Sequence, residues 1–202
     1  MIKSNLISNS KIIDPDFLLS AYASGYFPMA ESRQGDIQWH FPDTRAIIPI
    51  DGLKITRSLH QTIKKKKFQI RINTAFEEVM HQCAKRDDTW ISDEIIQSYV
   101  QLHKLGFAHS VEAWKDNFLA GGLYGVALGA AFFGESMFSR VRDASKVALV
   151  YLVDKLRAGK FELLDTQFNT PHLTRLGAIE IPRENYLHLL KKAVVKQRSF
   201  LD

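Results

Sequence analysis

The sequence contains a single cysteine, Cys83, among its 202 residues. One cysteine can form neither an internal disulfide nor a metal site made of several thiolates, so we expect a reducing compartment. No apolar run reaches the ~18 residues that would span a bilayer. The first residues, MIKSNLISNSKIID, lack an apolar core of signal-peptide length. We therefore expect a cytoplasmic protein without a membrane segment.

Several catalytic motifs are also missing. The seven histidines show no HExxH spacing, and neither a GxxxxGK(S/T) nor a GxGxxG phosphate loop occurs. The segment GESMF lacks the second glycine of a GxSxG nucleophile motif. Cys83 falls on the apolar face of a predicted helix, where thiols are usually inert. These absences disfavour a metal centre, a phosphate-loop nucleotide site and a covalent nucleophile.

The bulk composition is that of a globular protein. The chain is 46% hydrophobic and 24% charged, with a net charge of +5. Its length fits one large domain or a main domain with a small appendage. The basic excess favours an acidic partner such as nucleic acid.

Apolar periodicity and cap signals predict a mixed α/β chain. The predicted helices cover 14–25, 57–63, 74–84, 92–106, 182–195 and a segment that starts at Asp143 or Ser145 and ends at 158. The single strands cover 46–50, 68–72, 109–114, 161–168 and 177–181. Thr74-Ala75-Phe76-Glu77 is expected to form a capping box, and Asp116-Asn117 a hairpin turn. Adjacent hairpin strands followed by strand–helix units predict an α/β (α+β) fold, a mixed sheet with helices on its faces.

The first quarter of the chain is rich in aromatic and turn residues, as in GYFPM and WHFPD. We interpret it as a small N-terminal module laid on the main body. The predicted domains are 1–55 and 56–202.

The stretch Gly121 to Phe138, GGLYGVALGAAFFGESMF, is apolar and rich in glycine. It predicts two buried strands joined near Gly129, with Gly134 as a bulge or a point of close approach. Glu135 is its only carboxylate. A carboxylate in so apolar a setting is costly unless it is paired, so Glu135 is either a strand-end residue in water or an anion that awaits a cationic group.

Asp165 and Gln167 lie two residues apart in a predicted strand, so both side chains are expected on one face, with Thr166 on the other. Such a pair is either structural or functional. In the functional interpretation, Asp165 accepts from the Gln167 amide, and the Gln167 carbonyl accepts from a nucleophilic amine.

Four adjacent lysines, Lys64, Lys65, Lys66 and Lys67, follow the second predicted helix. Like charges repel, so this run is expected either in water or against an anion such as phosphate. Arg57 and Arg71 lie nearby in the sequence.

Several strings, taken together and in this order, resemble the leucyl/phenylalanyl-tRNA–protein transferases. They are GYFPM, TWI, HSVEAW, GGLYGVALG, FFGESMFS, ASKVAL, LLDTQ and LGAIEIPR. The resemblance runs from about Ile13 to about Leu190. It implies a small N-terminal domain plus a domain like the GCN5-related N-acetyltransferases. It also implies transfer of Leu or Phe (also Met) from aminoacyl-tRNA to the N-terminal Arg or Lys of proteins, marking them for N-end rule degradation.

The resemblance also implies roles for individual residues. Glu135 matches the glutamate that engages the α-amino group of the aminoacyl moiety, and Asp165 and Gln167 match the catalytic pair. Positions of the apolar pocket and stacking surface are matched by Trp90, Leu123, Phe132, Met137 and Leu149. Leu156 falls where some members carry Phe at the pocket wall. Trp39, rather than His40, is expected to stack on the terminal adenosine, and Lys64–Lys67 with Arg71 to hold the acceptor stem.

The partners implied are aminoacyl-tRNA and an acceptor protein, without a cofactor, and we expect a monomer. Two alternatives stay open: a small-molecule acyltransferase on the same fold and a non-catalytic RNA-binding module. The junction SMFSRVRDASKV lacks the glycine turn that acyl-CoA sites use to hold pyrophosphate, which disfavours the first. The second offers no reason for Glu135, Asp165 and Gln167.

Overall fold

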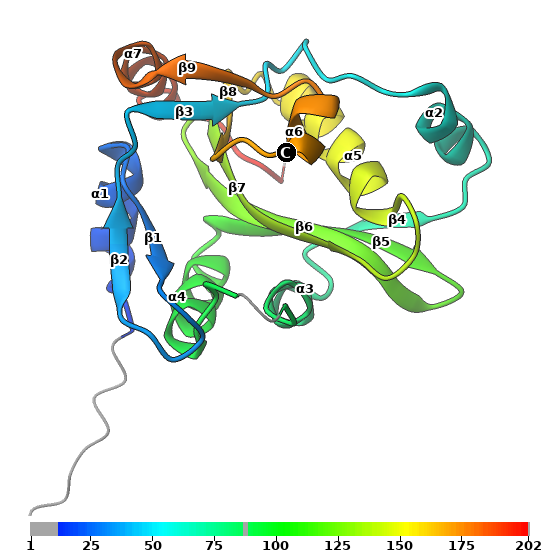
Figure 1. Cartoon of the computed structure of the whole chain (residues 1–202), viewed down its shortest axis with the longest axis horizontal. Helices are drawn as coiled ribbons and strands as arrows, with labels where there is room; N and C mark the ends of the chain where they lie inside the picture. The colour runs from blue at the N-terminus through cyan, green and yellow to red at the C-terminus, as the bar shows by residue number, and fades with distance from the viewer. Residues whose placement is uncertain (1–11, 87–88, 202) are drawn as a thin grey trace, which may run out of the picture.

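A computed structural model describes residues 12–86 and 89–201. Its main feature is a seven-stranded mixed sheet with helices on both faces, as the sequence predicted (Figure 1). Its strands, in spatial order, are β4 (Gln69–Ile72), β5 (Ala108–Lys115), β6 (Phe118–Leu128), β7 (Ala131–Ser139), β8 (Leu163–Gln167), β3 (Thr44–Ile47) and β9 (Ile179–Pro182). All neighbours are antiparallel except β7 and β8.

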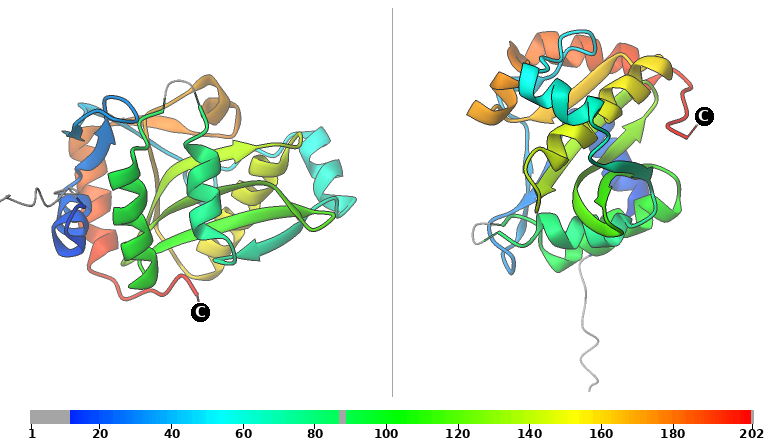
Figure 2. Two further views of the ribbon diagram at one scale, coloured as in Figure 1. Left: turned by 90° about the horizontal axis from the view of Figure 1, so that it is seen from below. Right: turned by 90° about the vertical axis from the view of Figure 1, so that its right-hand side faces the viewer.

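The parallel pair follows from the connection between its strands. Helix α5 (Ala144–Ala158) links β7 to β8 and packs over β5, β6 and β7. A crossover helix is the usual way to bring two consecutive strands into parallel register. The helices α2 (Arg57–Lys64) and α6 (Pro171–Arg175) lie on the same side as α5, whereas α3 (Phe76–Cys83) and α4 (Asp93–Lys104) cover the opposite face (Figures 1 and 2).

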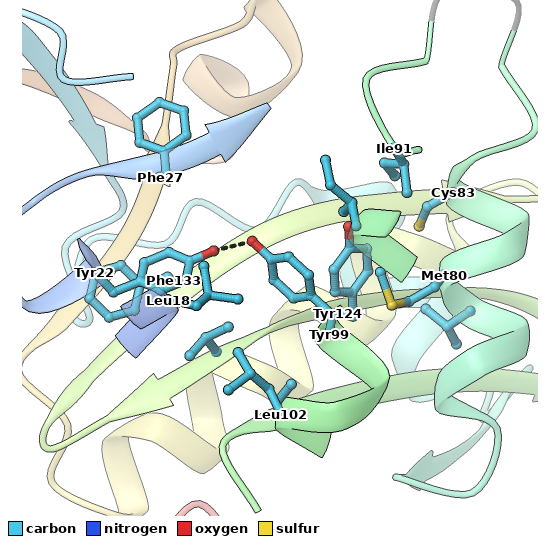
Figure 3. Close-up of a cluster of buried hydrophobic side chains, with 14 of the residues drawn as sticks. Leu18, Tyr22, Phe27, Met80, Cys83, Ile91, Tyr99, Leu102, Tyr124 and Phe133 are labelled. Carbon is cyan, nitrogen blue, oxygen red and sulfur yellow. Dashed lines mark hydrogen bonds between the residues drawn. The ribbon is translucent and has the colours of Figure 1, made fainter. Parts of the chain in front are cut away.

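The N-terminal part is more closely integrated than the sequence suggested. It consists of α1 (Pro15–Ala23) and a hairpin of β1 (Phe27–Ala30) and β2 (Ile37–His40), which include parts of the aromatic segments GYFPM and WHFPD. Tyr22 and Phe27 belong to the same buried cluster as Phe133 of β7 (Figure 3). Tyr186 of α7 (Arg183–Val194) is also part of this cluster. β3, inside the predicted 1–55 domain, lies between β8 and β9 of the main sheet. The division into domains stays a prediction.

Local signals were confirmed at two turns and failed at one helix start. Asp116 and Asn117 have φ of 49° and 63°, and Gly129 has φ of 59°, as their turns require. The capping box at Thr74 is wrong: α3 begins after Ala75 without a side-chain cap. Instead, the buried carboxylate of Glu112 accepts from the backbone N–H groups of Thr74 and Ala75, at 2.9 Å each.

Across the two described ranges, none of the helices combines the length and apolar character needed to cross a membrane.

Candidate active site

Glu135 is aimed by a β-bulge. In the pairing of β6 with β7, Tyr124 lies opposite Ser136 and Gly125 lies opposite Gly134, so Glu135 is the extra residue between them. A Cβ on Gly125 would lie 2.2 Å from the Phe133 carbonyl oxygen, so only glycine fits opposite the bulge. A bulge or a close approach was expected at Gly134; the structure has the bulge at the next residue, where it turns the side chain of Glu135 out of the strand's regular alternation.

The Glu135 carboxylate lies inside the protein rather than in open solvent. Its Oε1 accepts from the Tyr22 hydroxyl at 2.7 Å and from Gln167 Nε2 at 2.8 Å. Tyr22 in turn hydrogen-bonds the Tyr99 hydroxyl (Figure 3). Burial raises the pKa of Glu135 to about 8, although the bond from Tyr22 works in the other direction. In the part of the chain that the structure describes, Glu135 forms no ion pair, and an ammonium group beside it would reduce the cost of its charge.

An apolar cavity of about 90 Å³, which we call the slot, opens beside Glu135. Besides Glu135 and Ser136, it is lined by Leu123, Tyr124, Gly134, Met137, Leu149, Leu152, Leu164, Thr166 and Leu173. These residues come from β6, β7, α5, β8 and α6. Leucine and methionine walls make the slot suited to a hydrocarbon side chain.

A second, larger cavity of about 380 Å³ adjoins the slot, and we call it the outer cavity. It is lined by Phe27, Met29, Arg86, Trp90, Gln167, Phe168, Thr170 and His172, and it shares Glu135, Ser136, Met137, Thr166 and Leu173 with the slot. A ligand could thus place an apolar group in the slot, an ammonium at Glu135 and the rest of its mass in the outer cavity.

The predicted pair of Asp165 and Gln167 is arranged differently from the expectation. The side chain of Gln167 donates to Glu135, not to Asp165; only its backbone N–H reaches Asp165 Oδ1, at 2.8 Å. Gln167 has a φ of 57°, which breaks the strand's alternation. Thr166 and Gln167 therefore line the same cavity, and the prediction that they face opposite ways is wrong.

Sequence reasoning missed three residues that hold these groups. Arg45 of β3 forms a buried ion pair with Asp165, with Nη2 to Oδ2 at 2.7 Å. Tyr186 of α7 donates to the same oxygen at 2.8 Å. Tyr22 of α1 donates to Glu135. Each lies far in sequence from its partner, so no local pattern could have revealed the contact.

Two hydroxyl groups beside Glu135 are buried without a hydrogen-bond partner in the part of the chain that the structure describes. They belong to Tyr124 and Thr166, and both residues line the slot. Within the same described ranges, no group of three or more His, Cys, Asp or Glu side chains could hold a metal ion.

Not every residue predicted for the pocket lines it. Leu123, Met137 and Leu149 line the slot, and Trp90 lines the outer cavity. Phe132 of β7 and Leu156 of α5 are fully buried in the same core cluster and border neither cavity. Phe132 instead packs against Phe200, with ring centroids 5.2 Å apart.

The structure does not bring Trp39 to Glu135. Trp39 packs edge-on against Phe17 and lines a separate hollow together with Asp14 and Glu94. Its neighbour His40 faces the other way and stacks on Phe27, which lines the outer cavity. The two rings lie on different sides because successive strand residues face opposite sides, and stacking of Trp39 on the terminal adenosine stays a prediction.

The basic run lies away from Glu135, at the end of α2 and the start of β4. Lys65 and Lys67 line a cavity of about 450 Å³, and Lys115 and Arg142 line the same cavity. We call these four residues the basic cluster. Lys64 and Lys66 are exposed beside it. Arg71, the other predicted contact, stacks over Trp114 at 4.6 Å and is not part of the cluster.

Two family models cover nearly all of the described chain. The model for leucyl/phenylalanyl-tRNA protein transferase matches residues 47–191, and the model for the N-terminal domain of the same family matches residues 12–43. Curated proteins with the name leucyl/phenylalanyl-tRNA–protein transferase are similar over most of their length. One from Herpetosiphon aurantiacus is 55% identical over 95% of this chain and 100% of its own.

Further relatives with the same name give the same result. One from Akkermansia muciniphila is 51% identical over 92% of this chain and 98% of its own, and one from a Ruegeria species is 52% identical over 94% and 91%. Among solved structures, one titled as L-PGS from Bacillus licheniformis has a TM-score of 0.42 and 12% identity over 76% of this chain and 53% of that chain. That likeness is too distant to carry an argument.

The raised pKa of Glu135 predicts how stability depends on pH. Between the ordinary pKa of 4.5 and the folded value of about 8, the folded protein keeps a proton that the unfolded chain has lost. The free energy of unfolding therefore falls as pH rises through this window. Glu135→Gln removes this titrating group. The free energy of unfolding of the variant, relative to that of wild type, should therefore rise between pH 5 and 8 by up to a few kcal/mol, at about 1.4 kcal/mol per pH unit. Urea unfolding of both proteins from pH 5 to 9 measures this, and parallel curves would contradict it.

Proposed function

This chain belongs to the leucyl/phenylalanyl-tRNA protein transferase family, and we propose that the slot and the outer cavity are where its aminoacyl transfer takes place. The protein is an aminoacyltransferase that moves Leu or Phe from aminoacyl-tRNA to the N-terminus of a protein. The observation that supports this location is the placement of Glu135, a hydrogen-bonded carboxylate at the mouth of an apolar slot.

The donor is bound by its two ends. Its leucine or phenylalanine side chain enters the slot between Leu123, Leu149 and Leu152, and its ammonium pairs with Glu135. Because an ammonium beside Glu135 favours the ionised carboxylate, binding and ionisation reinforce each other. The terminal adenosine then occupies the outer cavity, where Trp90 and Phe168 offer aromatic faces. A stacked base is worth about 1–3 kcal/mol.

The reaction is an aminolysis of an ester. The α-amine of the acceptor attacks the ester carbonyl carbon, and the C=O electron pair moves onto oxygen. The intermediate collapses with cleavage of the bond to the ribose oxygen, which takes up the proton that the amine loses. The ester is already activated, so neither ATP nor a metal ion is needed. The protein contributes mainly positioning.

Gln167 is the group that receives the acceptor. Its amide nitrogen is committed to Glu135 at 2.8 Å, so its carbonyl oxygen is left to accept a hydrogen from the attacking amine. An amide oxygen is too weak a base to keep the proton, and it therefore orients the amine rather than deprotonating it.

We extend the proposal to an acceptor N-terminal Arg or Lys, to the N-end rule pathway, to a cytoplasmic location and to a monomeric enzyme, as the resemblance implied.

Transfer of labelled leucine from charged tRNA to a peptide with N-terminal arginine tests the function. Wild type should transfer leucine, whereas Glu135→Gln should lower kcat/KM by about 10- to 100-fold, the effect of losing a charge-assisted hydrogen bond. Donor carrying an N-acetylated leucine should be used poorly by both proteins. Equal activity of wild type and Glu135→Gln would contradict the role of Glu135. Transfer from acetyl-CoA, or tRNA binding without transfer, would instead favour one of the two alternatives.

The size of the slot predicts donor preference. Leu152→Phe places a larger side chain in the slot wall, so kcat/KM for the Phe donor should fall at least about 10-fold more than that for the Leu donor. One misplaced methylene costs about 1–3 kcal/mol. Leu105→Phe, at an exposed position on the far end of α4, is the matched control and should leave the ratio unchanged. Equal losses for both donors would argue against the slot as the side-chain site.

The basic cluster predicts a salt-dependent tRNA affinity. Lys65→Glu combined with Lys67→Glu should weaken tRNA binding by about 10-fold or more at moderate salt and flatten the dependence of log Kd on log salt. Lys191→Glu combined with Lys192→Glu changes the net charge equally on the exposed face of α7 and should have a smaller effect. Filter binding at several salt concentrations measures both. A wild-type affinity that ignores salt would contradict the assignment.

A further inference from the structure

Asp165 is saturated with hydrogen bonds. Oδ1 accepts from Arg45 Nε at 2.9 Å and from the Gln167 backbone N–H at 2.8 Å. Oδ2 accepts from Arg45 Nη2 at 2.7 Å, from Arg45 Nε at 3.1 Å and from the Tyr186 hydroxyl at 2.8 Å. A carboxylate has about four acceptor sites, and the side chain is 0% exposed. An incoming amine therefore finds no free lone pair on Asp165.

Arg45 is fixed as firmly as its partner. It is 2% exposed, and its guanidinium carbon lies 4.3 Å from the Phe27 ring and 4.6 Å from the Tyr186 ring. Its Nη1 donates to the Gly25 carbonyl oxygen at 3.1 Å. The guanidinium is thus held by β1, α7, β8 and the turn after α1. Because the guanidinium is fixed, the Asp165 carboxylate that pairs with it has little freedom to move.

Asp165 in turn fixes the backbone of Gln167. The bond from the Gln167 N–H to Asp165 Oδ1 closes a turn across two residues, a common use of aspartate. Gln167 has φ of 57°, a conformation that is unfavourable for residues other than glycine unless the surroundings enforce it. The same turn directs the Gln167 amide to Glu135.

We infer that Arg45 and Asp165 are positioning residues that hold Gln167 in its left-handed turn, and that the Asp165 carboxylate takes no proton during transfer. This role rests on the proposed function, in which Gln167 orients the attacking amine. The N-terminal part of the chain thereby reaches the reacting groups through Gly25, Phe27 and Arg45.

The test separates the charge of Asp165 from its hydrogen-bond geometry. Arg45→Met and Asp165→Asn each leave a buried charge without its partner, so each should lower kcat by about 100-fold, the effect of a misplacement of about 1 Å. The Arg45→Met/Asp165→Asn double variant leaves no buried charge unpaired, and the asparagine oxygen still accepts the Gln167 N–H. We expect its kcat to recover to within about ten-fold of wild type, with KM for the donor changed by less than about three-fold.

A matched control exists on the surface of the same region. Arg183 also pairs with an aspartate, Asp43, and lies over an aromatic ring, Phe41, at 4.4 Å. Arg183→Met should leave kcat unchanged. A double variant as slow as Asp165→Asn, with wild-type binding of the donor, would overturn the inference because the carboxylate itself would then be required. If the wild type transfers nothing, the proposed function fails and this role falls with it.

Tyr186→Phe provides a second readout if the double variant does not fold. The groups that face Asp165 are Arg45, Tyr186 and Glu135, and this variant removes one hydrogen bond without changing charge. A positioning carboxylate predicts a loss of kcat of only a few-fold, with an unchanged KM for the donor, because Arg45 and the Gln167 N–H still hold Asp165 in this variant. A fall in kcat as large as that of Asp165→Asn would overturn the inference.

Discussion

The structure depends on one electrostatic constraint: the Glu135 carboxylate is held beside an apolar slot, and none of the described residues forms an ion pair with it. The bulge at Glu135 turns the side chain out of β7, and Tyr22 and Gln167 hold it there. Burial raises its pKa to about 8, so a cation placed beside it would favour its ionised form. In the proposed function, the ammonium of the aminoacyl group is that cation.

Residues from the described N-terminal part, 12–50, belong to this arrangement. Tyr22 contacts Glu135, while Gly25, Phe27 and Arg45 enclose the ion pair that orders Gln167. The main sheet also takes β3 between β8 and β9. The N-terminal segment therefore completes the site, although its hairpin of β1 and β2 forms a separate small sheet.

Sequence reasoning was reliable where local chemistry decides the structure. The Asp116-Asn117 hairpin, the turn at Gly129 and the bulge beside Gly134 each depend on residues next to one another. It failed where partners come from distant segments. The carboxylate that accepts hydrogen bonds from the backbone before α3 belongs to Glu112, and no sequence pattern near Thr74 indicates this contact. Strand alternation misplaced the side chain of Gln167, because its left-handed backbone is enforced by Asp165 and Arg45. The resemblance located the slot residues Leu123, Met137 and Leu149, but Phe132 and Leu156 lie behind them in the core.

A crystal structure with a non-hydrolysable leucyl-adenosine amide tests the central claim most directly. The account predicts that the ammonium lies within hydrogen-bond distance of the Glu135 carboxylate, with the leucine side chain among Leu123, Leu149 and Leu152 and the adenosine in the outer cavity. A ligand bound with its ammonium away from Glu135, or with its leucine side chain outside the slot, would contradict it.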